Sequence, residues 1–416
     1  MATFLPFRAV RPTPGLAPRV VCPPYDVVDR CEARALAAGN DYSYLRVVRS
    51  DIAVDDSVPS DADEVYEAAA RTFWSWLNEG VLALDPTPTY TVYREHQAGR
   101  TQTGIVGLAS IDDYASGVIK RHEVTLVPKE RDRVRHFETV GAHTEPIWLA
   151  HRPDPTIAEV VARYTATTPL VDVTDAQGVR HEVWPIADSA DIDRVREAFA
   201  NLGALYIADG HHRAASATTV GTNRRQAGLP VGEADRVMAV AFAADQLHII
   251  DYNRYVTDLG DLDAATFLAA IADAGFTVEA SESPVRPHEP RTFGLYVGGH
   301  WYVLHAPQTP ERHGAKALDV ALLHDLLLEP VLGISDPRND PRIGFVGGIR
   351  GLDPLVEAAD RSGGAAFTVP PVTMETIMAV ADAGEIMPPK STWFEPKLGS
   401  GLFAHLLDEP TSSNAN

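Results

Sequence analysis

The feature that most constrains the fold is a short apolar run that passes directly into a polar cluster and then into an alanine-rich segment. The apolar run covers residues 204–208, the polar cluster covers residues 209–213, and the alanine-rich segment follows. This order predicts a strand, a tight turn and a helix. Asp209 is a good N-cap residue, and Gly210 tolerates any backbone angle. We therefore predict one β–turn–α unit here, around which the rest of the chain is organised.

The polar cluster places a carboxylate, two imidazoles and a guanidinium at the predicted start of the helix, on Asp209, His211, His212 and Arg213. A helix N-terminus presents unpaired backbone N–H groups and the positive end of the helix dipole, so it binds anions such as phosphate. A guanidinium beside it strengthens such a site. Asp-Gly is also common in ordinary turns, and neighbouring histidines often lie on a polar surface. The cluster alone leaves both interpretations open.

The composition limits the classes of function. The chain has 416 residues, 45% hydrophobic and 22% charged, which is enough for two or three globular domains. With 57 acidic and 36 basic residues, the net charge is -21, which disfavours nucleic acid as a partner. Cys22 and Cys31 are too few for a disulfide framework or a zinc knuckle and fit a reducing cytosol. No apolar segment is long enough to span a bilayer, so we predict a cytoplasmic protein with no membrane partner.

Two further polar clusters are expected near the β–turn–α unit. Two prolines precede Tyr25 and Asp26, which places these side chains on a stiff loop, although a purely structural turn is an equal alternative. The second cluster, at a strand end or in the loop after it, contains two cations, an imidazole and a carboxylate, on Lys120, Arg121, His122 and Glu123. Polar clusters at the ends of separate strands are expected where they line one pocket. We therefore expect these two clusters to lie close to residues 209–213.

Periodicity along the chain predicts a mixed α/β fold. Residues 61–80 have helical spacing, and residues 89–96 and 101–111 form a predicted hairpin. Residues 129–136 are densely charged and are interpreted as the solvated face of a helix.

The pattern changes after residue 256. Residues 317–328 form a predicted apolar helix that ends near Pro330. Lys390-Ser391-Thr392 resembles the end of a P-loop, but Pro389 occupies the glycine position, so no Walker A motif is present. We predict three parts: a domain over residues 1–255, an α+β domain over residues 256–408, and a disordered tail over residues 409–416.

Several motifs spread along the chain carry a resemblance to a known family. They are PPYDVV (23–28), IKRHE (119–123), ADGHHR (208–213), LDVALLHDLLLEP (318–330) and MPPKSTWFEPKLGSGL (387–402). This set resembles a large bacterial and archaeal family catalogued as a domain of unknown function. ADGHHR is in turn similar to the signature of the ParB/sulfiredoxin superfamily, which includes SerK-type kinases of free L-serine. The resemblance implies a ParB/sulfiredoxin-like N-terminal domain.

Positions at which this chain differs from these relatives show which of them it resembles most. Sulfiredoxins have a cysteine where this chain has His211, so sulfinic acid repair is disfavoured. ParB proteins have a Gly-Glu-Arg-Arg type of loop and a DNA-reading module, whereas this chain is strongly acidic. Relatives usually have Thr-His-Arg where this chain has Tyr252-Asn253-Arg254, so Arg254 is retained and Asn253 replaces the family histidine. The SerK-like interpretation fits best.

The leading hypothesis is a nucleotide-dependent kinase that uses ATP or ADP with Mg²⁺ and phosphorylates a small hydroxylated metabolite such as L-serine. Phosphoryl transfer needs phosphate positioning, a cation and a carboxylate that accepts the hydroxyl proton. Glu123 is the predicted base, Asp209 the predicted ligand of magnesium or of the hydroxyl, and His211 a catalytic residue. The predicted nucleotide-binding residues are Gly210, His212, Arg213, Lys120, Arg121 and Arg254. The predicted substrate-binding residues are Tyr25, Asp26, Lys390, Ser391 and Thr392.

Two alternatives belong to other classes. A nucleotide-binding regulator of the ParB-like type would bind the nucleotide without turning it over. A metal-assisted phosphoesterase would use His211, His212, Asp209 and Glu123 as ligands, although adjacent histidines at a helix start point in different directions. The substrate, the phosphoryl donor and a homo-oligomeric state are left open by the sequence.

Overall fold

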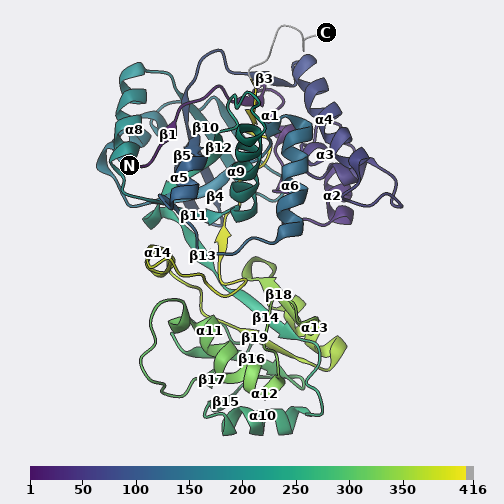
Figure 1. Cartoon of the computed structure of the whole chain (residues 1–416). Coiled ribbons are helices and arrows are strands. Elements are labelled where there is room, and N and C mark those ends of the chain that lie inside the picture. Colours follow the sequence, from purple (N-terminus) through teal and green to yellow (C-terminus); the bar gives the residue numbers. More distant parts are fainter. Residues whose placement is uncertain (409–416) are drawn as a thin grey trace. The chain divides into compact units, whose positions relative to one another are not determined.

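The computed structural model describes residues 1–408, and the chain divides into two compact units (Figure 1). The first unit contains residues 1–121, 125–247 and 396–408. The second contains residues 248–395, together with the three residues His122–Val124. The predicted division at residue 255 thus differs from the observed grouping. The main difference lies at the end of the chain, because the segment after Glu395 packs with the first unit.

The first unit is built on a nine-stranded mixed sheet within residues 1–408. Its strand order is β6-β11-β8-β12-β5-β4-β10-β9, and β1 pairs with β5. Most neighbouring pairs are antiparallel, whereas β11 with β6 and β12 with β8 are parallel. The strands are β1 Phe4–Leu5, β4 Tyr90–Gln97, β5 Arg100–Ser110, β6 Ile119–Lys120, β8 Ile147–His151, β9 Val171–Thr174, β10 Arg180–Ile186, β11 Leu205–Asp209 and β12 Arg236–Ala243.

Helices bury the apolar side chains of this sheet. In Figure 1 the strands β5, β12 and β4 lie between α8 and α9. The core under them includes Phe4, Trp184, Phe199 and Ala217. The helices of this unit are α1 Ala17–Val20, α2 Arg30–Ala37, α3 Leu45–Val48, α4 Asp63–Asn78, α5 Ile111–Ser116, α6 Val127–Val140, α7 Pro155–Thr165, α8 Ser189–Asn201 and α9 His211–Gln226, with 3₁₀ turns η1 Ser50–Ala53 and η2 Ala244–Gln246.

A second core of the first unit lies among its N-terminal helices. Tyr44, Phe73 and Trp76 are buried there, and the end of the chain returns to this region through Ala404 and Leu406. The predicted helix over residues 61–80 is confirmed as α4, and its aromatic stripe is core as its spacing indicated. The small sheets here pair β2 Val10–Pro12 with β3 Leu82–Leu84, and β7 Ala142–His143 with β21 His405–Leu406.

The predicted β–turn–α unit is confirmed as β11 followed by α9. The N-cap assignment of Asp209 is wrong: the N-cap residue is Gly210 at φ 89, and no side chain caps the helix. Asp209 is still the last residue of β11, and its carboxylate is held by cations instead. A left-handed N-cap favours glycine, which has no Cβ to resist it.

The predicted hairpin is also confirmed, with β4 and β5 paired from Gln97 and Arg100 inward. Its two turn residues, Ala98 and Gly99, both have positive φ. Such a turn matches the twist of the strands.

The second unit contains a six-stranded antiparallel sheet in the order β15-β17-β16-β19-β14-β18, counted within residues 1–408. Helix α13 packs on it through Leu355 and Ala359, which belong to the same core cluster as Trp301 and Tyr296. The strands are β13 His248–Ile250, β14 Tyr252–Val256, β15 Thr277–Ser281, β16 Thr292–Val297, β17 His300–His305, β18 Ile343–Gly347, β19 Ala365–Thr368 and β20 Trp393–Glu395. The helices are α10 Ala264–Asp273, α11 Asp319–Leu323, α12 Glu329–Leu332, α13 Asp353–Ser362 and α14 Met374–Asp382, with 3₁₀ turns η3 Gly314–Ala317 and η5 Gly348–Arg350.

The helix predicted to end near Pro330 runs past it. A π-helical turn, η4 His324–Leu328, joins α11 to α12, and the helix ends at Gly333 with φ 65. Pro330 is the second residue of α12 and directly follows the residue after the π-helical turn.

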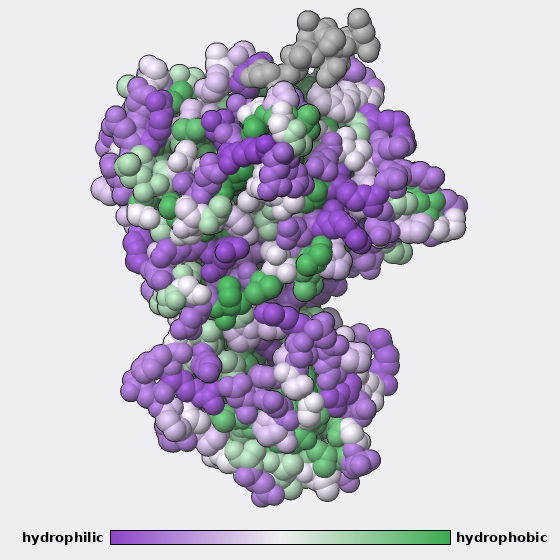
Figure 2. Space-filling model, in the orientation of Figure 1, coloured by the Kyte–Doolittle hydropathy of each residue, from purple (hydrophilic) through white to green (hydrophobic). Residues whose placement is uncertain are grey.

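The mixed α/β fold class is therefore confirmed. On the face drawn in Figure 2, hydrophilic residues predominate over the first unit, with apolar residues scattered among them. Among the helices of residues 1–408, none combines the length and the apolar character needed to cross a bilayer. The predicted disordered tail, residues 409–416, lies outside the described residues.

Candidate functional site

The candidate site is centred on the carboxylate of Asp209, at the junction of β11 and α9. Its Oδ2 lies 3.0 Å from Nη2 of Arg213, and its Oδ1 lies 3.1 Å from Nζ of Lys397. Burial raises the pKa of Asp209, but Lys397 and Arg213 outweigh burial and hold the pKa below its usual range. Asp209 is therefore an anion that fixes two cations beside the start of α9.

Arg213 is almost fully buried and holds two chain segments together. Its Nη1 donates to the carbonyl of Pro146 at 2.6 Å, while Nη2 reaches Asp209. Its Nε is buried and has no hydrogen-bond partner among the described residues. This nitrogen lies beside Gly210, where an added Cβ would approach it to 3.1 Å. Arg213 thus presents one unused N–H group next to an uncapped helix N-terminus.

The loop that carries Tyr25 and Asp26 reaches the same cluster through Glu145. The backbone N–H of Tyr25 donates to Oε1 of Glu145 at 3.2 Å, and the hydroxyl of Ser400 donates to the same oxygen at 2.6 Å. Burial raises the pKa of Glu145, and Arg213 opposes this shift. Burial lowers the pKa of Arg213, but the negative charges of Asp26, Glu145 and Asp209 outweigh it. The PPYDVV loop and the start of α9 therefore belong to one electrostatic cluster.

The sequence predicted that residues 129–136 form the solvated face of a helix. This prediction is wrong for two residues of α6. Arg133 and His136 are both buried. The guanidinium of Arg133 lies 4.2 Å from the ring centroid of Tyr25. Helix α6 packs against α9 as well as α4, so its polar residues face other helices as well as solvent.

The two adjacent histidines point in different directions. His211 is buried, and burial lowers its pKa to about 4, although Asp209 opposes this shift. His212 instead accepts a hydrogen bond from the backbone N–H of Leu126 through Nε2 at 3.0 Å. At neutral pH His211 is therefore an uncharged imidazole, whereas His212 supports the start of α6.

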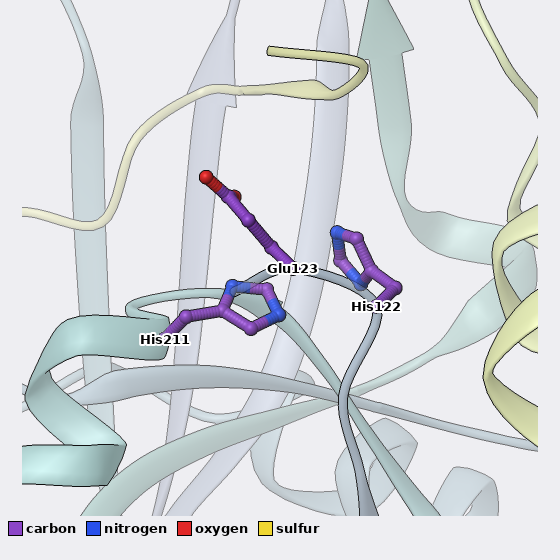
Figure 3. A group of neighbouring side chains, drawn as sticks. All are labelled: His122, Glu123 and His211. Atoms are coloured by element: carbon purple, nitrogen blue, oxygen red, sulfur yellow. The ribbon is translucent and has the colours of Figure 1, made fainter. Parts of the chain in front are cut away.

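The IKRHE segment is brought to the same edge of the sheet by parallel pairing. Lys120 in β6 pairs with Tyr206 in β11, so the chain beyond each strand leaves at the same end. Arg121 packs over the ring of Tyr114 at 4.9 Å. Ligand atoms of His122, Glu123 and His211 all lie within 4.8 Å of one another, and Figure 3 shows these three side chains where the loop after β6 passes the start of α9.

This group of three side chains fits some metals better than others. Two imidazole nitrogens and one carboxylate suit a transition metal or zinc, whereas magnesium prefers oxygen ligands. Both oxygens of Asp209 are engaged by cations, so the geometry does not support the predicted magnesium role of Asp209.

Besides Glu123, four predicted site residues belong to the second unit. Arg254 is buried, and its guanidinium donates to the backbone carbonyls of Tyr252 and Lys390. Burial lowers the pKa of Arg254 to about 10. Lys390 has a φ of 57, and its Nζ lies 5.6 Å from the ring centroid of Tyr252. Ser391 donates to the carbonyl of Pro388, and the hydroxyl of Thr392 lies 3.5 Å from Nε2 of His122.

Four residues of the cluster were missed in the sequence: Arg133, Glu145, Lys397 and Ser400. Lys397 and Ser400 lie within the motif at residues 387–402, and Glu145 precedes the buried strand β8. A signal existed for Lys397, since it sits between a proline and a glycine-rich turn in that motif.

Replacing Gly210 with alanine tests the geometry of this junction. We expect Gly210→Ala to lower the free energy of unfolding by more than the roughly 1–2 kcal/mol that a left-handed backbone costs a side chain, because the new Cβ also meets Arg213. Gly228→Ala is the matched control, since Gly228 has a φ of 66 and open space around it. Equal losses for the two variants in urea titrations would contradict the contact.

The fold and the cluster define a mixed α/β protein with buried cations at the start of a helix. This chain belongs to the family described as protein of unknown function DUF1015, whose model matches residues 4–321. The predicted membership of a domain-of-unknown-function family is thereby confirmed. No curated protein matches the chain.

Solved structures give only distant likenesses. One is SbnI with a C-terminal truncation from Staphylococcus aureus, with a TM-score of 0.41, 13% identity, and coverage of 74% of this chain and 92% of that one. Another is a free serine kinase in complex with AMP, with a TM-score of 0.35, 14% identity, and coverage of 71% and 91%. A conserved hypothetical protein from Pyrococcus furiosus has a TM-score of 0.35, 14% identity, and coverage of 72% and 94%. Likenesses at this level carry no argument about activity.

Proposed function

We propose that this protein is a nucleotide-dependent kinase of a small hydroxylated metabolite, with free L-serine as the first acceptor to test. The observation that carries the proposal is the unused Nε–H of Arg213 beside the uncapped start of α9. A buried donor without a partner is costly, and a phosphate oxygen would satisfy it together with the helix N–H groups.

The other residues have roles that follow from their chemistry. Glu123 accepts the proton of the acceptor hydroxyl, because it is a carboxylate on the loop that passes the start of α9. Asp209 holds Arg213 in place and thereby shapes the phosphate site. His211, uncharged at neutral pH, offers a hydrogen bond without adding a second positive charge beside Arg213. Lys120 and Arg121 flank the nucleotide. Magnesium, which the ATP or ADP phosphates bring with them, is assigned to none of these residues.

Arg254 of the second unit is a further candidate ligand-binding residue. Within residues 1–408, no carboxylate lies within ion-pair distance of Arg254, although this guanidinium is only 3% exposed. A buried cation without a counter-ion favours an anionic ligand. We assign Arg254 and Lys390 to the carboxylate of an amino-acid acceptor, and Ser391 and Thr392 to its polar groups.

The test is a transfer assay with the purified full chain. ATP and ADP labelled in the terminal phosphate are offered with a panel of hydroxylated metabolites that includes L-serine, with and without Mg²⁺. We expect a new labelled product whose formation requires an acceptor. Release of inorganic phosphate without an acceptor would instead indicate a phosphoesterase, for which the group of His122, Glu123 and His211 is the candidate metal site. Tight nucleotide binding without any transfer would indicate a regulator.

A further inference from the structure

The last described stretch of the chain, Pro396–Leu407, returns to the first unit and is tied to it at several points. Ser400 exchanges backbone hydrogen bonds with Cys22 at 3.1 and 2.9 Å. Ala404 does the same with Val10 at 2.9 and 2.8 Å, and β21 pairs with β7. The stretch is therefore an integral part of this unit, although it follows the second unit in the chain.

This stretch places Lys397 beside the carboxylate of Asp209. Nζ of Lys397 lies 3.1 Å from Oδ1, and the side chain is 15% exposed. Arg213 occupies the other oxygen, so one carboxylate holds two cations. Glu145 and Asp26 add negative charge near Arg213. Arg213 and Lys397 thus converge on the carboxylate of Asp209 beside the start of α9.

A buried polar network holds the chain on both sides of Lys397. On one side, Nε2 of Gln102 donates to the carbonyl of Pro396 at 3.1 Å. On the other, the backbone N–H of Gly399 donates to the hydroxyl of Tyr93 at 3.1 Å. Glu95 links the two, because it accepts from Tyr93 at 2.8 Å and from Gln102 at 2.7 Å. All these side chains are buried.

The network also contains a buried charge. His181 lies 2.7 Å from the hydroxyl of Tyr93 and 3.2 Å from the carboxylate of Asp175. Burial lowers the pKa of His181, but Asp175 and Glu95 outweigh it and raise the pKa to about 9. Replacing a buried charged network with apolar side chains is often neutral or stabilising, so the presence of this network is consistent with a role in fixing the position of the chain around it. That position is the backbone on either side of Lys397.

We propose that Lys397 is a second phosphate-binding residue of the Asp209 site, beside Arg213, and that Tyr93 and Gln102 are positioning residues that hold its segment. The proposal rests on the proposed function, because it needs a nucleotide at the start of α9. Asp209 then acts as a clamp that aligns two cations, and a polyphosphate contacts both of them. Because the contact is with phosphate, its contribution increases with the number of phosphates.

The test compares the affinities of AMP, ADP and ATP by calorimetry for the wild-type chain, Lys397→Met and Lys397→Arg. We expect Lys397→Met to weaken ATP and ADP by about tenfold or more, as for loss of one charge-assisted hydrogen bond, and to weaken AMP less. Lys397→Arg should retain most of the affinity. Lys129→Met, which removes an exposed lysine of α6, is the matched control and should change none of the three affinities.

Tyr93→Phe tests the positioning role. It removes the acceptor of the Gly399 N–H without touching the cluster, so ATP affinity should fall while AMP affinity stays close to that of the wild-type chain. A loss of thermal stability with all three affinities unchanged would overturn the positioning role. Unchanged ATP affinity in Lys397→Met, with the wild-type chain binding ATP, would overturn the proposal for Lys397 alone. Failure of the wild-type chain to bind ATP or ADP would overturn the proposed function as well.

Discussion

Glu123→Gln should leave nucleotide affinity unchanged and reduce transfer to the acceptor by about 10²–10⁴-fold. Glutamine keeps the size of the side chain and its capacity for hydrogen bonds, but it accepts no proton. Transfer from a nucleotide to a hydroxyl needs such an acceptor, whereas phosphate binding at the start of α9 does not. The measurement is single-turnover transfer of labelled phosphate, together with calorimetric titration of ATP into the same variant.

Glu138→Gln is the matched control for this variant. Glu138 lies on the exposed side of α6, outside the predicted site, so its loss should change neither transfer nor binding. Full acceptor-dependent transfer by Glu123→Gln would show that another carboxylate is the base, and Asp26 would be the next to replace. Loss of nucleotide affinity in Glu123→Gln would indicate a ligand-holding role, which the group with His122 and His211 also allows.

The local structure of the candidate site could be predicted from the sequence, because it depends on neighbours in the chain. An apolar run, a glycine and an alanine-rich segment were sufficient for β11 and α9. The misreading of Asp209 has a physical cause. Its residue type suits an N-cap, but its carboxylate is held by Arg213, four residues later in the same motif, and by the distant Lys397, and Gly210 forms the N-cap instead.

The partners of the cluster could not be predicted from the sequence in the same way. Lys397 lies 188 positions from Asp209 in the chain, and Ser400 lies 255 positions from Glu145. Periodicity and spacing report only contacts within one element or between adjacent ones. The charged pattern of residues 129–136 was misleading for the same reason, since the burial of Arg133 depends on α4, α9 and the loop at Tyr25. The contacts of such residues emerge only when the sheet brings distant segments together.

Arg213→Met should lower the free energy of unfolding by about 3–5 kcal/mol, the usual cost of breaking a buried ion pair by removing one partner. Methionine fills much of the same volume, so the loss reports charge and hydrogen bonds rather than a cavity. Three consequences add up. Asp209 keeps Lys397 but loses its second cation, Glu145 loses the positive charge that opposes its neutralisation, and the carbonyl of Pro146 loses its donor.

Arg225→Met is the matched control, because it lies on the same helix and forms an exposed ion pair with Asp112 at 2.6 Å. An exposed pair contributes at most about 1 kcal/mol, so urea titration should separate the two variants clearly. The double variant Arg213→Met/Asp209→Asn should recover part of the loss, because it no longer leaves the carboxylate of Asp209 beside an apolar side chain. A loss for Arg213→Met no larger than that for Arg225→Met would contradict the buried cluster, since it would mean that solvent or a rearranged side chain satisfies Asp209 without the guanidinium.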